Sequence, residues 1–169
     1  TYDSYRPMAE AAGAVVKAVK LAAPGWRLTE EALRAAITQK TRAILINSPH
    51  NPAGRAFSRE ELEALARAVS GTDIVVVCDE VYEHMVYDGA AHIPLATLPG
   101  LRGRCLKIGS AGKIFSLTGW KVGWVCGPRE LVSVVTKAHQ FITFTTSPAL
   151  QAGVAYGLMH EMDYPLQLA

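Results

Sequence analysis

The chain has 169 residues, the size of one domain, and half of them are hydrophobic, which excludes a mainly disordered chain. Lysine and arginine total 17 against 15 acidic residues, with no basic run, so charge gives no reason to expect a nucleic-acid or membrane partner. The sequence lacks both an apolar run long enough to span a membrane and a secretory signal, so we expect a cytosolic chain.

A strand, a helix and a second strand are predicted in the first 46 residues. Residues 14–21 read as a strand with several apolar side chains on one face. Thr29 can cap a helix whose first turn holds Glu30 and Glu31, because acidic side chains are favoured at that end of a helix. Residues 43–46 are wholly apolar, which is typical of a short buried strand.

The next helix has the clearest signal in the chain. Ser58 and Glu61 have the spacing of a capping box, and apolar residues follow at helical spacing until the helix ends at Ser70. Residues 74–78 form an unbroken apolar run, as in strands buried on both faces of a parallel sheet, and lead directly into Asp79. Acidic residues at the carboxyl end of a central strand indicate a site.

Two strands and two helices are predicted after residue 100. Residues 106–108 and 122–126 read as strands, and the segment between them carries no helical stripe. A parallel crossover needs such a helix, so we expect the last strand to run antiparallel to its neighbour. Pro128 and Ser147-Pro148 begin helices that run to about residues 140 and 158. The expected fold is a three-layer α/β/α domain with a mostly parallel sheet and one antiparallel strand.

The cysteines and histidines give no metal-site pattern. Cys78, Cys105 and Cys126 lack C-x-x-C spacing, and each lies in an apolar stretch, so we expect three reduced thiols in the core and no metal. The five histidines are scattered, and we interpret them as structural or surface residues, although His50 adjoins Asn51 and could line a site.

Four polar segments follow or precede predicted strands, at residues 51–54, 79–82, 110–113 and 119–123. Ligands of open α/β sheets bind at the strand ends. The segment around Lys113 is not a phosphate-binding P-loop, because Lys107 and Ile114 stand where that loop needs glycine and a hydroxyl residue. A lysine beside glycines at a strand end can instead form an imine with a carbonyl group, and the alternative is a solvated loop lysine.

Five other residues of these segments are candidates for ligand binding. Asp79 needs a cationic partner or several hydrogen bonds to stay ionised, and a protonated pyridine nitrogen would be such a partner; the alternative is a helix cap or a structural ion pair. Tyr82 could hydrogen-bond a ligand oxygen or anchor its loop. Ser110 and Lys121 could together hold a phosphate. Asn51 lies in a loop stiffened by prolines, which suits an amide aimed at a ring oxygen.

In this order, the four segments resemble the class I aminotransferases, fold-type-I enzymes that use pyridoxal 5′-phosphate. The run GSAGKIFSLTGWKVGW at residues 109–124 is most similar to the kynurenine, glutamine and methionine aminotransferase branch, and the resemblance covers essentially the whole chain. It implies that Lys113 forms the Schiff base with the cofactor and carries the proton. The implied reaction is a ping-pong transfer of an amino group from an L-amino acid to a 2-oxo acid.

The resemblance also assigns the other candidates. It implies that Asp79 keeps the pyridine nitrogen protonated and that Tyr82 and Asn51 hydrogen-bond the phenolic oxygen of the ring. Ser110 and Lys121 would bind the phosphate, and Lys121 stands where many relatives have arginine, so the charge is kept and the bidentate fork is lost.

Family members are more than twice as long as this chain. Their glycine-containing phosphate loop, the aromatic residue that stacks on the ring, and the small domain with its carboxylate-binding arginine are expected outside residues 1–169. We therefore expect a partial cofactor-binding large domain that does not transaminate alone and that belongs to a homodimer when complete.

Three other functions are alternatives for a chain with these residues. The same lysine and aspartate serve carbon–sulfur β-lyases that act on cysteine conjugates. A ligand-binding domain of a transcription regulator could use the same fold without catalysis. A nicotinamide oxidoreductase is disfavoured, because no strand is followed by G-x-G-x-x-G.

Overall fold

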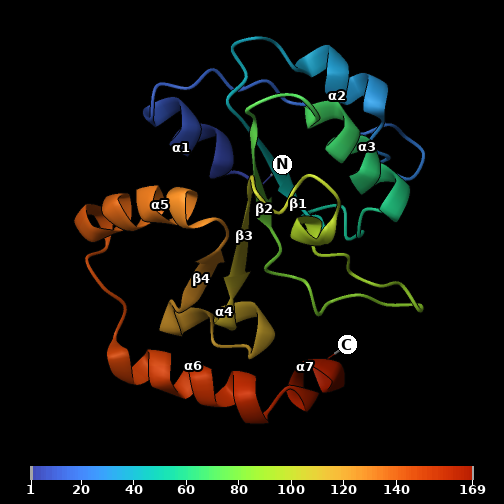
Figure 1. Cartoon of the computed structure of the whole chain (residues 1–169). Coiled ribbons are helices and arrows are strands. Elements are labelled where there is room, and N and C mark those ends of the chain that lie inside the picture. The colour runs from blue at the N-terminus through green and yellow to red at the C-terminus, as the bar shows by residue number, and fades with distance from the viewer. Residues whose placement is uncertain (1, 169) are drawn as a thin grey trace.

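Within residues 2–168, the part of the chain that this computed structural model describes, four strands form one mixed sheet in the order β1-β2-β3-β4 (Figure 1). The strands are β1 (Ala43–Asn47), β2 (Val75–Asp79), β3 (Cys105–Ser110) and β4 (Gly123–Cys126). The first three run parallel and β4 runs antiparallel to β3, which confirms the expected mostly parallel sheet and its antiparallel strand.

Helices lie on both sides of the sheet, as expected for three α/β/α layers. In Figure 1, α2 and α3 lie on one side of the sheet and α1 and α5 on the other. The helices are α1 (Tyr5–Ala11), α2 (Glu30–Ala36), α3 (Arg59–Val69), α4 (Ala111–Ile114), α5 (Arg129–Ile142), α6 (Pro148–His160) and α7 (Asp163–Leu168), with short 3-10 turns η1 at Leu95–Thr97 and η2 at Thr118–Trp120. Over residues 2–168, none of these helices combines the length and the apolar character needed to cross a membrane.

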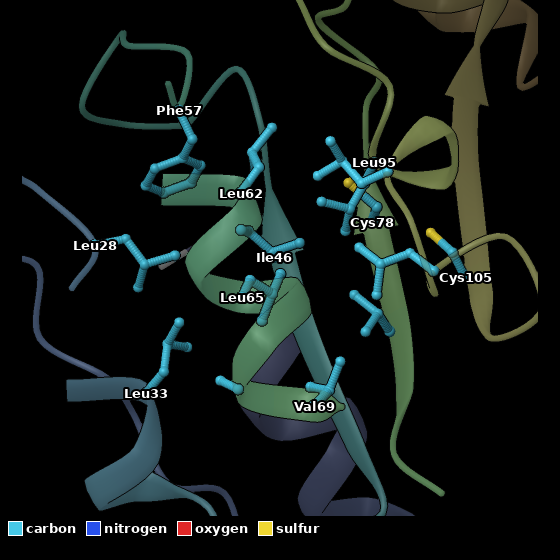
Figure 2. Close-up of a cluster of buried hydrophobic side chains, with 14 of the residues drawn as sticks. Leu28, Leu33, Ile46, Phe57, Leu62, Leu65, Val69, Cys78, Leu95 and Cys105 are labelled. Carbon is cyan, nitrogen blue, oxygen red and sulfur yellow. The ribbon is translucent and has the colours of Figure 1, made fainter. Parts of the chain in front are cut away.

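The main core lies between the sheet and α3. Ile46 of β1 and Cys78 of β2 are register partners, and both belong to the buried cluster that includes Leu62 and Leu65 of α3 (Figure 2). The expectation that β2 is buried on both faces is only half right: Val76 and Cys78 are fully buried, but the alternate residues of β2 are partly exposed. The two faces of β2 therefore lie in different environments, one in the core and one partly exposed.

The starts of α2 and α3 confirm the predicted caps. The Thr29 hydroxyl accepts a hydrogen bond from the Ala32 amide at 3.2 Å. Ser58 and Glu61 form the reciprocal capping box, in which each side chain accepts a hydrogen bond from the other residue's amide. These signals are local, so the sequence alone predicts them.

Glu61 does more than cap α3. Its buried carboxylate also accepts a hydrogen bond from the Leu28 amide at 2.8 Å and forms a bidentate pair with the Arg55 guanidinium, with a closest approach of 2.6 Å. Burial alone would raise the pKa of Glu61, but the Arg55 pair and the amides of Ser58 and Leu28 lower it to about 2. One carboxylate thus joins the loop before α2, the loop after β1 and the start of α3.

This geometry predicts a loss of stability in Glu61→Gln. Because the pKa of Glu61 is lower in the folded state than its ordinary value of 4.5, the ionised carboxylate stabilises the fold above pH 4.5. This contribution is lost as the pH falls toward 2. We expect Glu61→Gln to lower the free energy of unfolding by about 2 to 3 kcal/mol at pH 7. Urea unfolding at several pH values would measure it. The difference should shrink below pH 4.5, and the control Glu63→Gln, at a partly exposed side chain of the same helix, should change stability by less than about 0.5 kcal/mol. An equal loss in both variants would contradict this account.

Two expectations about local structure are wrong. Residues 14–21 form no strand, and the Val15 side chain is 97% exposed. A strand needs a hydrogen-bonding neighbour, and residues 14–21 pair with none among the residues that the structure describes. The nearest β pairing is an isolated bridge between Ala22 and Arg27, just after the segment. Cys126 is exposed rather than buried, because β4 is the last strand of the described sheet, whereas Cys78 and Cys105 are buried as expected; all three are free thiols.

The two long helices at the carboxyl end were expected at α5 and α6 and extend only slightly beyond the predicted ends. Three helices were not predicted: α1, α4 and α7. They have seven, four and six residues, and two turns or fewer are too short for an apolar stripe to repeat.

Candidate active site

The carboxyl ends of the three parallel strands bring the polar segments to one edge of the sheet. Asn47 at the end of β1 is the register partner of Asp79 at the end of β2, and Asp79 is in turn the partner of Ile108 in β3. Ser110 ends β3, and α4 with Lys113 follows directly. The polar segments that follow β1, β2 and β3 therefore lie at one edge of the sheet, as predicted.

Asn51 and Tyr82 meet across this edge. The Asn51 amide Nδ2 donates a hydrogen bond to the Tyr82 hydroxyl at 3.3 Å. Asn47, which is almost fully buried, holds the Asn51 loop in place: its Oδ1 accepts from the Asn51 backbone amide at 2.7 Å, and its Nδ2 donates to the Asp79 carbonyl at 3.0 Å. Sequence reasoning did not single out Asn47, whose role depends on the pairing of β1 with β2.

The Asp79 carboxylate has a partner that the sequence did not indicate. The Tyr5 hydroxyl of α1 donates a hydrogen bond to Asp79 Oδ2 at 2.5 Å, and the Val81 amide donates to Oδ1 at 3.2 Å. Burial and the neighbouring carboxylate raise the pKa of Tyr5 well above its ordinary value, so Tyr5 remains a donor at neutral pH. The Tyr2 ring packs edge-on against Tyr5, with 5.5 Å between ring centroids. The amino-terminal segment therefore contributes aromatic residues to this site.

Lys113 lies beside Tyr82. Its Nζ is 5.5 Å from the centroid of the Tyr82 ring, a distance at which the ring attracts a cation. The lysine is half-buried, and it helps to line a small pocket together with Met85 of the Tyr82 loop and Pro165 of α7. An amine, a carboxylate and the Asn51–Tyr82 pair thus share one edge of the sheet.

Glycines allow the close packing around α4. At Gly109 in β3, the Trp124 indole occupies the place of a side chain, and at Gly112 a Cβ would lie 2.9 Å from the Thr118 Cα. Larger residues at either position would push the turn with Lys113 away from the sheet.

Ser110 and Lys121 are brought together only through the backbone. Ser110 is the register partner of Gly123, and the next amide, that of Ala111, donates to the Val122 carbonyl at 3.1 Å. The Ser110 hydroxyl makes no capping bond to α4, and Lys121 is exposed in a left-handed conformation at φ 55°. Joint phosphate binding by these two side chains stays a prediction.

His50 has a structural environment. Its Nδ1 accepts a hydrogen bond from the Ala53 amide at 3.3 Å, and its ring packs edge-on against Phe57, with 6.1 Å between centroids. Burial lowers the pKa of His50, which favours the neutral ring that accepts this bond. These contacts agree with the interpretation of His50 as a structural residue.

Comparison with known proteins places this geometry in a family. Residues 1–164 match the family described as "Aminotransferase class I and II". The probable N-succinyldiaminopimelate aminotransferase DapC of Mycobacterium tuberculosis is 46% identical over 162 residues, which cover 95% of this chain and 41% of that protein. Human kynurenine–oxoglutarate transaminase 1 is 42% identical over 171 residues, which cover 95% of this chain and 40% of that protein.

Solved structures agree with the sequence matches. The N-succinyldiaminopimelate aminotransferase from Mycobacterium tuberculosis aligns with a TM-score of 0.90 and 42% identity, over 99% of this chain and 44% of that chain. YbdL from Escherichia coli, described with a methionine aminotransferase function, aligns with a TM-score of 0.94 and 34% identity, over the same shares. The chain spans about two fifths of the length of the curated relatives it matches. Sequence, fold and strand-end geometry together show that the chain belongs to the class I and II aminotransferase family.

Proposed function

We propose that the protein containing this chain transfers an amino group from an L-amino acid to a 2-oxo acid, using pyridoxal 5′-phosphate held as a Schiff base on Lys113. The observation that carries the proposal is the meeting of Lys113, Asp79 and the Asn51–Tyr82 pair at one sheet edge, in a chain of an aminotransferase family. Small-molecule substrates, a homodimeric complete protein and a cytosolic location belong to the same proposal.

The donor set of this edge fits the proposed cofactor. Asp79 supplies a carboxylate, oriented by Tyr5 and the Val81 amide, which can face a protonated ring nitrogen. The Tyr82 hydroxyl and the Asn51 amide can donate hydrogen bonds to an oxygen on the ring. For the phosphate, the chain offers the Ser110 hydroxyl and the Lys121 ammonium.

When bound, the cofactor supplies a ring that withdraws electrons from the substrate α-carbon. This chain's residues would do the rest. Lys113 would hold the cofactor until an amino acid displaces it, and its freed amine would then move the proton at the α-carbon. Asp79 would keep the ring nitrogen positively charged, and Asn51 and Tyr82 would fix the tilt of the ring.

Reduction with borohydride tests the proposal. Reduction of the protein expressed from its complete reading frame, followed by intact mass and a peptide map, should show a pyridoxyl adduct on Lys113 and none on Lys107 or Lys121. Absence of the adduct after cofactor is supplied would refute the proposal. Product analysis separates the reactions of this cofactor: a new amino acid indicates transamination, whereas pyruvate and ammonia from a cysteine conjugate indicate β-elimination.

A further inference from the structure

The residue after Asp79 points to the other face of the sheet. Successive side chains of a strand alternate between its faces, so Glu80 leaves the side on which Asp79 meets Tyr5. Glu80 is completely buried. Its carboxylate accepts hydrogen bonds from the Leu95 amide and interacts with His92 Nε2, both at 2.9 Å. A fully buried acidic residue next to a candidate site residue requires an explanation.

A single lysine joins Glu80 to Glu83. Lys107 extends from β3, and its Nζ lies 3.6 Å from the Glu80 carboxylate while also forming an ion pair with Glu83. The Lys107 and Glu83 side chains are only 22% and 14% exposed. Among the described residues, Lys107 is the only cation in ion-pair contact with Glu83. We call these three residues the Lys107 clamp.

The environment of the clamp favours the charged forms of Lys107 and Glu80. Burial alone would lower the pKa of Lys107, but Glu83 and Glu80 raise it above its ordinary value. Burial alone would raise the pKa of Glu80, but the hydrogen bonds from His92 and the Leu95 amide lower it. Two carboxylates therefore share one partly buried ammonium, and removing that ammonium would leave both without their common cation.

The two acidic residues of the clamp lie on either side of Tyr82 in the sequence. Glu80 and Glu83 flank Tyr82, and residues 81–94 form only turns and irregular backbone. Around Tyr82, the local backbone bonds of this loop are two turn hydrogen bonds, from the Glu83 amide to the Glu80 carbonyl and from the Met85 amide to the Tyr82 carbonyl. The loop has no ladder of its own, so its position depends on side-chain anchors at its ends.

We propose that Glu80, Glu83 and Lys107 are positioning residues that fix the Tyr82 hydroxyl beside Asn51 at the cofactor edge. None of the three touches the reacting atoms, and the inference rests on the proposed function of that edge. The ion pairs of Lys107 connect β3 to both ends of the Glu80–Glu83 turn, so the ring of Tyr82 is held from the opposite face of the sheet.

A metal site is the alternative use of this cluster. Ligand atoms of Glu80, Glu83 and His92 lie within 4.8 Å of one another. The Lys107 ammonium already supplies the positive charge that the two carboxylates require, and a metal ion would have to displace it. The geometry therefore favours the positioning role.

Hydrogen exchange of the complete protein without added cofactor tests the clamp directly. Lys107→Met removes the cation and keeps most of the side-chain length, whereas Lys107→Arg keeps the charge. The amides of Glu83 and Met85 should exchange about tenfold faster in Lys107→Met, because the turn opens more often. Exchange in Lys107→Arg should stay near that of the wild type, and peptides from α3 should be unchanged in both.

Cofactor binding links the clamp to the site. The dissociation constant for pyridoxal 5′-phosphate should rise about tenfold in Lys107→Met, because a mobile Tyr82 loses its fixed contact. Lys107→Arg should restore tight binding, and Lys40→Met, which removes an exposed lysine elsewhere, should bind as the wild type does. If Lys107→Met does not fold, Glu83→Gln keeps the same turn and should show the same changes at smaller size.

Two results would overturn the proposal. One is unchanged exchange at Glu83 and Met85 in a folded Lys107→Met protein, and the other is faster exchange with unchanged cofactor affinity. Failure of the proposed function would look different, because the wild-type protein would then bind no cofactor. In that case the exchange measurement still decides whether Lys107 orders the turn around Tyr82.

Discussion

Lys113→Arg in the complete protein is expected to lower kcat for amino-group transfer by at least about 10³-fold, because one residue supplies both the covalent attachment and the proton carrier. The Lys113 Nζ lies 5.5 Å from the centroid of the Tyr82 ring, and arginine would keep a cation beside that ring. Its guanidinium stays protonated, so it can neither form the imine nor accept the substrate proton. Steady-state transamination assays and borohydride reduction of the same preparation measure both losses.

The control for this substitution is Lys40→Arg, which makes the same change at an exposed lysine and should leave the rate unchanged. Unfolding of Lys113→Arg should stay within about 1 kcal/mol of the wild type, because Lys113 is only half-buried and the cation is kept. If the variant retains more than about a tenth of the wild-type rate, Lys113 is not the proton carrier.

The parts of the fold predicted correctly have signals within a few residues. The caps at Thr29 and Ser58 are formed by residues three positions apart, so the sequence alone marks where α2 and α3 begin. The antiparallel direction of β4 followed from the lack of a crossover helix, which is also a local property. By contrast, the strand expected at residues 14–21 required a partner strand, and periodicity carries no information on pairing.

The candidate site shows the same division. Motif resemblance singled out Asn51, Tyr82 and Lys113, and the structure brings these three together. The contacts of Tyr5 with Asp79 and of Lys107 with Glu83 were not predicted, because they span 74 and 24 residues of the chain. Only the three-dimensional arrangement of α1, β2 and β3 reveals such partners, since neither residue lies in a motif with a chemical signature.

Asp79→Asn is expected to lower the transamination rate by about 10²- to 10³-fold, because the neutral amide cannot hold a positive charge on the ring nitrogen. Asparagine has nearly the same shape as aspartate. Its single Oδ1 can still accept the hydrogen bond from the Val81 amide, while its Nδ2 takes the place of Oδ2 and can donate to the Tyr5 hydroxyl oxygen. The substitution therefore removes the charge with little change in packing. Turnover and the cofactor content of the purified protein should be measured together.

Tyr5→Phe separates charge from orientation at the same carboxylate. It removes the hydroxyl that donates to Asp79 Oδ2 at 2.5 Å but leaves the charge in place, so we expect a loss of no more than about tenfold. A loss in Tyr5→Phe as large as that in Asp79→Asn would mean that the orientation of the carboxylate, held from α1, matters as much as its charge. A fully active Asp79→Asn would contradict the assignment itself, because the ring nitrogen would then need no negative partner.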